Sequence, residues 1–431
     1  MNEQMIRKKN MKIYPLYQML SWDLLFYYAI IFLFLTQVKG FTASEVLIAD
    51  SFYGIFRILF QIICINIVDS LGKQKSLLLG NILVTISIIL MIIGQNFLFL
   101  IFAFFIQAIG YNFKGICEPT ILSDSIPKSS FSSNIYSKIY GKGTSFYYIF
   151  DAISSVATGF LYVINPYIPM IMCFVCCLAS TIISLAFENP IILENNTQNI
   201  KNPGFIDYYK DMLITFKQIM KSNRLKSLLI FSLCFWAFYS VFGTLRSSIL
   251  VDLYVPEQYF GIIIAGCQIL SSISSQKYNW FHKKFKNRAL SWISLSSVSS
   301  FIFTGLIVIC NIKYILSIVT VLLTIILFGI IKGPYFTLLQ TYFNSFSNPN
   351  VNAKIFAVKS LLENIGRVIM GLFTSFLLSI TTTSYALVII GCMFFIIFVF
   401  LLESMKTKVG LNPEEYSEED LIFSNESSTL Q

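Results

Sequence analysis

The chain has 431 residues, of which 56% are hydrophobic and only 12% are charged. Soluble domains carry about 25% charged residues, so this composition excludes a chain built mainly of water-soluble domains. The formal net charge of +9 comes almost entirely from short loops between apolar segments. Membrane topology accounts for such a distribution, so no nucleic-acid partner is expected.

Twelve apolar segments are each long enough to cross the ~30 Å hydrocarbon core of a bilayer as a helix. Helices are expected because a backbone exposed to lipid must satisfy its own hydrogen bonds. The predicted fold class is therefore an all-α membrane protein with twelve transmembrane helices. In chain order, the segments cover residues 16–38, 45–68, 77–95, 98–121, 139–164, 167–187, 226–252, 257–276, 289–310, 314–343, 354–380 and 384–403.

Lys and Arg residues in the loops predict the orientation of these segments. They gather in the amino-terminal segment, in the carboxyl-terminal tail and in every second loop, whereas the opposite loops carry only Lys39 and Lys313. Because cytoplasmic loops carry the excess of positive charge, this alternation predicts a multi-pass protein of the inner (cytoplasmic) membrane. Both termini are expected in the cytoplasm.

A long central loop divides the chain into two halves. Residues 1–187 and 226–403 are predicted to form two pseudo-symmetric six-helix bundles, joined by a cytoplasmic linker at 188–225. Apolar residues recur at helical spacing from Phe205 to Met220, which predicts an amphipathic helix on the membrane surface. This helix is interpreted as a linker or, alternatively, as a regulatory or partner-binding element. Residues 404–431 form an acidic cytoplasmic tail.

Ionisable residues are costly inside a bilayer and normally face protein or a water-filled path. Here they are missing from the interiors of the third, sixth, ninth and twelfth segments. The simplest physical account is that these four segments face lipid, while the charged segments surround a polar cavity. The candidate substrate and proton pathway consists of Asp23, Arg57, Lys114, Glu118, Asp151, Arg246, Lys332, Glu363 and Arg367.

Some of these charges have an oppositely charged neighbour one helical turn away. Lys114 and Glu118 are four residues apart, as are Glu363 and Arg367, and this spacing favours an ion pair on one helix face. Such pairs either hold helices in register or take part in transport. Both interpretations remain open for both pairs.

Asp23 and Asp151 have no oppositely charged neighbour at that spacing, and they are the favoured proton carriers. Aromatic residues adjoin both carboxylates. They form either an aromatic wall for an apolar or cationic solute or ordinary packing, and they are Trp22, Tyr27, Tyr28, Tyr147 and Tyr148.

Enzymatic and metal chemistry is not expected. The single histidine, His282, lies in a loop, so no histidine cluster can form at membrane depth. The nine cysteines lie within apolar segments and are interpreted as small packing residues. The sequence contains no nucleotide-binding loop, so ATP is not expected to drive the protein directly, and no cofactor is expected.

One loop carries a resemblance to a known family. The sequence between the second and third segments, Asp69-Ser-Leu-Gly72-Lys73-Gln-Lys75, resembles the signature loop of the major facilitator superfamily. Asp69, Gly72 and Lys73 match the family pattern, whereas Ile65 replaces its first glycine. The resemblance implies a bacterial transporter in which Asp69, Gly72 and Lys73 belong to the gating motif.

The resemblance also implies a function. We expect a secondary active transporter that moves a small organic solute by alternating access of two six-helix bundles. Proton coupling, efflux and a monomeric state are expected; the alternatives are a solute uptake permease and a lipid or flippase-type transporter. The fourth segment has Gln107 and Lys114 where many proton-driven members have an arginine, which argues against a classical multidrug exporter.

Overall fold

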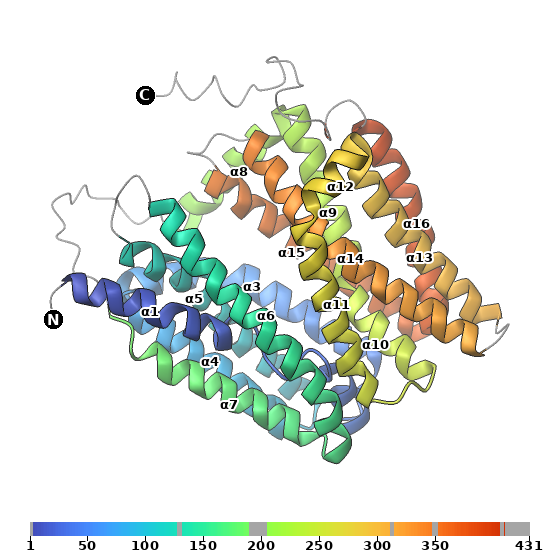
Figure 1. Cartoon of the computed structure of the whole chain (residues 1–431), viewed down its shortest axis with the longest axis horizontal. Helices are drawn as coiled ribbons and strands as arrows, with labels where there is room; N and C mark the ends of the chain where they lie inside the picture. Colours follow the sequence, from blue (N-terminus) through green and yellow to red (C-terminus); the bar gives the residue numbers. More distant parts are fainter. Residues whose placement is uncertain are drawn as a thin grey trace. The chain divides into compact units, whose positions relative to one another are not determined.

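The structure is a computed structural model that describes residues 3–126, 132–188, 205–310, 314–346, 352–405 and 409. Over these residues, all regular elements are helices, which confirms the predicted all-α class (Figure 1). The chain divides into two compact units. Unit 1 comprises Met1–Phe205 with Pro256–Ala265, and unit 2 comprises Ile206–Val255 with Gly266–Gln431.

Within the described residues, ten helical segments are long and apolar enough to cross a membrane. They correspond to ten of the twelve expected segments. The first and eighth expected segments do not meet the same criteria of length and composition. The ten are Ala43–Leu71, Lys73–Ile93, Phe97–Ser125, Ile139–Ile164, Tyr167–Ser184, Asn223–Asp252, Ala289–Cys310, Tyr314–Leu339, Val358–Ile380 and Thr383–Met405.

The first expected segment is broken, although the sequence predicted one helix over 16–38. Helix α1 (Glu3–Ser21) ends before Asp23, and the helical structure resumes only at α2 (Ile31–Leu33) and a π-helical turn (Phe34–Val38). The Asp23 carboxylate accepts a hydrogen bond from the Leu24 backbone N–H at 2.9 Å. Such local bonds compete with the helical hydrogen-bond ladder. Phe26 then adopts a left-handed φ of 59°, which an α-helix does not allow.

Five long helices complete the first half of the chain. The first of these helices, α3, begins with a capping box. The Thr42 hydroxyl accepts from the Glu45 N–H, and the Glu45 carboxylate accepts from the Thr42 N–H. Gly72 separates α3 from α4 and has a φ of 83°, a conformation that favours glycine. The helices are α3 (Ala43–Leu71), α4 (Lys73–Ile93), α5 (Phe97–Ser125), α6 (Ser132–Ile164) and α7 (Tyr167–Ser184).

The amino-terminal part of α1 is tied to the ends of α5 and α7. Lys9 forms an ion pair with Glu188 at 2.5 Å. The Asn10 amide donates to the Ser125 hydroxyl at 2.9 Å and to the Glu188 carbonyl at 2.8 Å. The Arg7 guanidinium donates to the Ile126 carbonyl at 3.2 Å. These bonds hold the start of α1 beside the last described residue before the central loop.

The second half of the chain contains the predicted amphipathic segment as helix α8 (Phe205–Lys221). Its location on a membrane surface stays a prediction. Eight further α-helices follow, with a short 3-10 turn at Lys286–Arg288. They are α9 (Asn223–Ser240), α10 (Phe242–Asp252), α11 (Gln258–Gln276), α12 (Tyr278–Phe285), α13 (Ala289–Cys310), α14 (Tyr314–Phe346), α15 (Asn352–Ile380) and α16 (Thr383–Met405).

Aromatic rings form the core of unit 2. The ring centroid of Phe238 on α9 lies 4.7 Å from that of Phe301 on α13 and 5.3 Å from that of Phe394 on α16. Phe328 on α14 joins them at 5.9 Å from Phe238. These phenylalanines are therefore core residues of unit 2.

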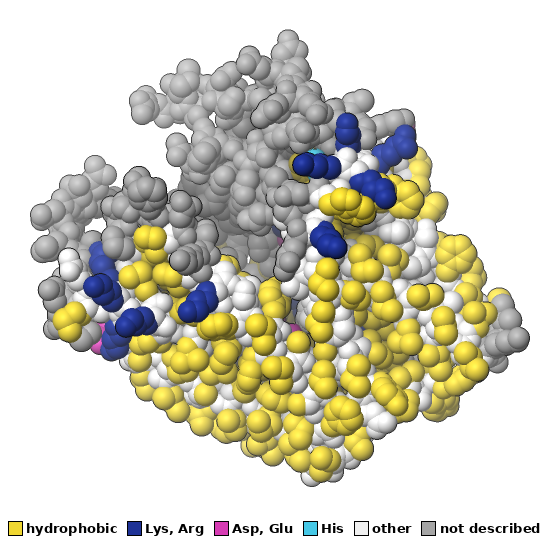
Figure 2. Space-filling model, in the orientation of Figure 1, with side chains coloured by type: hydrophobic (Ala, Val, Ile, Leu, Met, Phe, Trp, Pro, Cys, Tyr) yellow, Lys and Arg dark blue, Asp and Glu magenta, His cyan; other side chains and the backbone are white. Residues whose placement is uncertain are grey.

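Broad apolar faces remain exposed on α7 and α16, two of the helices expected to meet lipid. Hydrophobic side chains also cover most of the described face in the space-filling view (Figure 2). This exposure supports lipid contact for both helices. The exposed residues include Ile171, Met172, Val175, Leu178 and Ile182 on α7, and Ile389, Phe395, Ile396, Val399 and Phe400 on α16.

The contact between α4 and α5 yields a prediction about stability. A Cβ atom added at Gly110 would lie 2.8 Å from the Gly80 carbonyl oxygen and 2.8 Å from a Val84 methyl carbon. Overpacking of this kind costs about 1–3 kcal/mol, so Gly110→Ala should lower the midpoint of thermal unfolding in detergent. Gly141→Ala is the matched control, because nothing lies within 4 Å of a Cβ at Gly141. Equal midpoints for the two variants would contradict the close packing of α4 on α5.

Candidate functional site

The end of α1 meets a buried lysine of α5. The last turn of a helix leaves backbone carbonyls without helical partners. At this end, the Lys114 ammonium donates a hydrogen bond to the Ser21 carbonyl at 2.5 Å. Lys114 is only 3% exposed, so its charge lies inside unit 1. A buried charge must be compensated nearby, and two carboxylates provide this compensation.

The first carboxylate is Glu118, one turn further along α5. Its Oε1 lies 3.9 Å from the Lys114 Nζ, which confirms the ion pair predicted from their spacing. The same oxygen accepts hydrogen bonds from the Tyr17 hydroxyl at 2.8 Å and the Ser21 hydroxyl at 3.1 Å. The Asn81 amide of α4 donates to the Tyr17 oxygen at 2.9 Å, so three helices meet at this group.

The second carboxylate is Asp23, in the broken stretch after α1. Its Oδ1 accepts from the Tyr28 hydroxyl at 2.7 Å and the Tyr111 hydroxyl at 3.2 Å, in addition to the Leu24 N–H. Lys114 contacts the same tyrosine, because its Nζ lies 4.9 Å from the ring centroid of Tyr111. We call Tyr17, Ser21, Asp23, Tyr111, Lys114 and Glu118 the α1–α5 polar cluster.

The charges of the α1–α5 polar cluster do not balance when both carboxylates are ionised. Lys114 contributes one positive charge against Asp23 and Glu118. One added proton would neutralise the cluster, so its chemistry suits reversible proton binding. Tyr28, whose hydroxyl donates to the Asp23 carboxylate, is 48% exposed as a residue.

Aromatic residues of α6 border this cluster. The Trp22 ring lies 5.4 Å from Tyr140 and 6.3 Å from Tyr147, measured between centroids. Asp151 itself is buried on α6, with 5% exposure. Tyr147 thus lies one helical turn before Asp151 and faces Trp22, the neighbour of Asp23 in the chain.

Arg57 of α3 lies apart from the cluster and is bound to α5. Its Nε donates to the Asn112 side-chain oxygen at 3.3 Å, and the Asn112 amide donates to the Arg57 carbonyl at 2.9 Å. The guanidinium carbon lies 6.0 Å from the ring centroid of Tyr53. These bonds make Arg57 a group that holds α3 against α5.

In unit 2, the described charges from the candidate pathway are dispersed over several helices. Glu363 forms an ion pair with Lys359 at 2.9 Å and accepts from the Ser232 hydroxyl at 2.8 Å. Lys332 donates to the Gln268 side-chain oxygen at 3.3 Å. The Arg246 guanidinium carbon lies 5.7 Å from the ring centroid of Phe242. Arg367 lies on α15, one turn after Glu363, and it is half-buried.

The loop with the family resemblance is well defined in unit 1. Asp69 is exposed in the last turn of α3, and Gly72 makes the turn into α4. Lys73, at the start of α4, forms an ion pair with Asp124 near the end of α5. The pair joins two ends of helices that lie together at one end of unit 1. Sequence reasoning did not identify Asp124 as a partner, because the spacing of 51 residues gives no local signal.

The described residues contain no group of three or more His, Cys, Asp or Glu side chains that could hold a metal ion. A family model described as Major Facilitator Superfamily matches residues 16–358, which is most of the chain. The chain belongs to the major facilitator superfamily. Members of this family are transporters, so membrane transport is the general activity of this protein. None of the curated proteins matches the sequence.

Solved structures of other transporters share the fold of this major facilitator protein. The nucleoside transporter NupG matches with a TM-score of 0.67 at 13% identity, covering 97% of this chain and 100% of its own. A D-xylose-proton symporter matches with a TM-score of 0.66 at 10% identity, covering 96% and 98%. A POT family transporter in complex with 5-aminolevulinic acid matches with a TM-score of 0.65 at 14% identity, covering 93% and 95%. Such low identities show the fold alone.

The burial of Lys114 yields a prediction about stability. Lys114→Gln leaves Asp23 and Glu118 without their cation, and removal of one partner of a buried pair costs about 3–5 kcal/mol. The midpoint of thermal unfolding in detergent should fall accordingly. Adding Glu118→Gln to this variant should restore part of the loss, because it removes one of the uncompensated charges. Lys75→Gln, at an exposed position of the same unit, is the control and should leave the midpoint unchanged.

Proposed function

We propose that this major facilitator protein is a proton-coupled secondary transporter of a small organic solute in the cytoplasmic membrane. It works as a monomer by alternating access, with both termini in the cytoplasm. The observation that supports proton coupling is that Lys114 pairs with Glu118 and contacts Tyr111, whose hydroxyl binds Asp23 at the broken end of α1. A discontinuous helix is a common way in which transporters expose backbone groups to a substrate or a coupling ion.

Asp23 is the proposed proton carrier of the α1–α5 polar cluster. It lies in the broken stretch after α1 and bonds to Tyr28, a half-exposed residue, whereas Glu118 is enclosed by Tyr17, Ser21 and Lys114. A proton on Asp23 would leave Lys114 and Glu118 as a neutral pair. Loss of that proton would restore the unbalanced negative charge. The two protonation states thus differ in the charge that a bound solute would meet.

The remaining pathway residues have separate proposed roles. Asp151 accepts or passes on the proton beside Tyr147, which lies one turn before it on α6 and faces Trp22. Arg246, Lys332, Glu363 and Arg367 are assigned to the solute pathway within unit 2. Arg57 is assigned to it within unit 1, where its bonds to Asn112 also hold α3 against α5. Asp69, Gly72 and Lys73 form the gate, in which the ion pair of Lys73 with Asp124 is a contact that can form and break.

Efflux is the direction that we propose, because Trp22, Tyr140 and Tyr147 place an aromatic surface beside a carboxylate. Such a surface suits an amphiphilic or cationic solute. Uptake is the second candidate direction. It is favoured by the name of one similar structure, a D-xylose-proton symporter.

Proton coupling can be tested with the purified protein in vesicles that contain a pH-sensitive dye. Uridine, D-xylose, dialanine and ethidium are added in turn, and the solute that moves protons in the wild type is kept. Asp23→Asn should abolish solute-driven proton movement, because an amide cannot carry the proton. The same variant should still exchange labelled solute for unlabelled solute, since exchange needs no net proton transfer.

Asp50→Asn is the control for this experiment, because Asp50 is a carboxylate of unit 1 outside the candidate pathway. It should keep both activities. Unchanged proton movement in Asp23→Asn would refute the assignment of Asp23. Loss of proton movement in Asp151→Asn alone would identify Asp151 of α6 as the proton carrier instead.

The direction can be tested in intact cells that produce the protein. With an inward proton gradient, efflux predicts that the cells hold less of the transported solute than cells without the protein. The difference should vanish when an uncoupler removes the gradient. Accumulation above the level of cells without the protein would establish uptake instead.

A further inference from the structure

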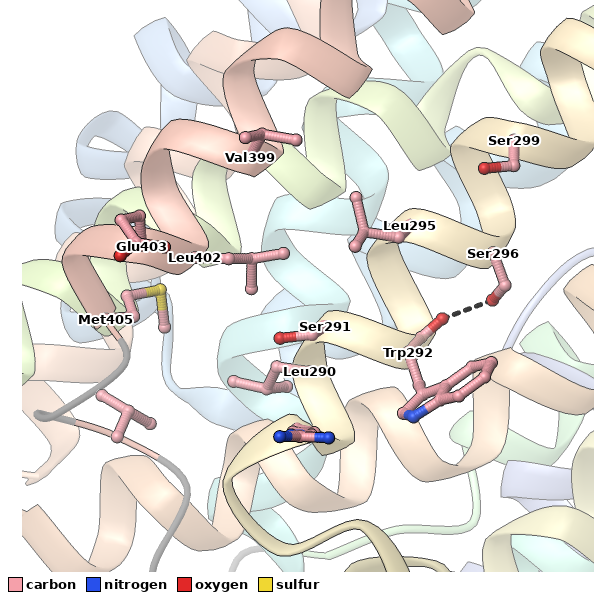
Figure 3. Close-up of a pocket in the computed structure, with 12 residues that line it drawn as sticks. Leu290, Ser291, Trp292, Leu295, Ser296, Ser299, Val399, Leu402, Glu403 and Met405 are labelled. Atoms are coloured by element: carbon pink, nitrogen blue, oxygen red, sulfur yellow. Dashed lines mark hydrogen bonds between the residues drawn. The ribbon is translucent and has the colours of Figure 1, made fainter.

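A groove at one end of unit 2 plays no part in the proposed transport pathway. It lies between α13 and α16 and has a volume of about 610 Å³ (Figure 3). Leu290 and Leu295 of α13 and Val399 and Leu402 of α16 form its apolar walls. Three serines of α13 lie along it, at positions 291, 296 and 299. Both helices have charge-free interiors, so they belong to the set expected to face lipid.

The groove has the depth of one leaflet of a bilayer. It begins at Arg288, directly before α13, and extends along that helix to Ser299. Eleven residues of helix span about 16 Å at 1.5 Å per residue. The hydrocarbon core of a membrane is about 30 Å thick, so the groove reaches from the membrane surface to near the bilayer centre.

Basic residues gather where the groove opens. Arg288 lines it, and Lys283, Lys284 and Lys286 are exposed in the segment that precedes it. Figure 2 shows Lys and Arg side chains gathered above the hydrophobic surface at the end of unit 2 where α12 lies. By the distribution of Lys and Arg among the loops, this is the cytoplasmic side. Glu403 is the acidic residue of the lining, and these four basic residues outnumber it.

Two exposed tryptophans, Trp280 and Trp292, lie on the two helices near the opening of the groove. Trp292, one turn into α13, lines the groove and is 55% exposed. Trp280 on α12 is 60% exposed, and the Lys284 Nζ lies 5.0 Å from its ring centroid. Tryptophan is enriched at the level of lipid head groups, where one side of the ring is apolar and the other is wet. The basic opening of the groove therefore lies at the head-group level.

We propose that this groove binds an anionic phospholipid of the cytoplasmic leaflet. The phosphate of the head group lies at Arg288, and one acyl chain runs along Leu295 and Val399 toward Ser299. Charge complementarity supports this occupant, since basic pockets between helices on the cytoplasmic side suit anionic head groups. A soluble anion would use Arg288 but not the apolar walls.

The test uses Trp292 as a reporter of its own groove. The full-length protein is placed in vesicles that contain equal fractions of either phosphatidylglycerol or phosphatidylcholine with brominated acyl chains. Bromine quenches tryptophan at contact, and subtraction of the Trp292→Phe variant isolates the signal of Trp292. We expect stronger quenching of Trp292 by brominated phosphatidylglycerol than by brominated phosphatidylcholine.

Three variants separate the contributions to this preference. One basic residue near a membrane surface contributes about 1 kcal/mol, so Arg288→Gln should lower the preference for phosphatidylglycerol about fivefold. Ser299→Phe should weaken quenching by both lipids, because the larger side chain fills the inner part of the groove. Lys75→Gln, an exposed basic residue of unit 1, should leave the preference unchanged.

Each other outcome overturns the proposal. Equal quenching by the two brominated lipids would make the groove part of an unselective lipid annulus. An absence of quenching by either lipid would mean that protein covers Trp292. Stronger quenching by brominated phosphatidylethanolamine than by phosphatidylglycerol would assign recognition to an amine beside Glu403 instead.

Discussion

The contact of the Lys114 ammonium with the Ser21 carbonyl is the constraint on which the first half of the structure depends. It places a positive charge at the carboxyl end of a helix, where the backbone carbonyls carry partial negative charge. It also fixes the place where α1 ends, so that Asp23 leaves the helix and turns toward Tyr111. The broken helix, the buried cation and the two carboxylates are thus one arrangement, and none of its parts would be stable alone.

The two units handle their buried charges differently. In unit 1, residues of α1, α4 and α5 converge on one connected set of hydrogen bonds around Lys114. In unit 2, the described pathway charges are bound to separate neighbours, such as Ser232 and Lys359 for Glu363 and Gln268 for Lys332. Aromatic packing around Phe238 provides the cohesion of that unit instead. A connected set can respond to a proton as a whole, which is why the proposed coupling belongs to unit 1.

Much of the fold follows from the sequence, because apolar length and helical spacing are local signals. Of the twelve predicted segments, ten are helices long and apolar enough to cross a membrane. The helix in the central loop and the pair of Lys114 with Glu118 were also predicted. The break in α1 was missed, since an apolar and aromatic run continues directly after Asp23, from Leu24 to Leu35. The break has two causes. The Asp23 carboxylate accepts a local hydrogen bond from the Leu24 N–H, and Lys114 of α5 donates to the Ser21 carbonyl. The second bond depends on tertiary structure. The ion pair of Lys73 with Asp124 was not predicted, because it too depends on tertiary structure. The spacing of Tyr111, Lys114 and Glu118 on one face of α5 was a signal that could have been used.

The break after Ser21 also has a consequence for the biogenesis of the protein. The first segment is synthesised before α5, yet the Ser21 carbonyl and the Asp23 carboxylate receive hydrogen bonds from Lys114 and Tyr111 of α5. Unsatisfied polar groups are costly in lipid, so the first segment cannot hold its broken form until about ninety later residues have been inserted. Before then, a continuous helix has the lowest free energy, because it satisfies the backbone hydrogen bonds of the segment internally. We therefore expect the first segment to change conformation within the membrane once α5 is inserted.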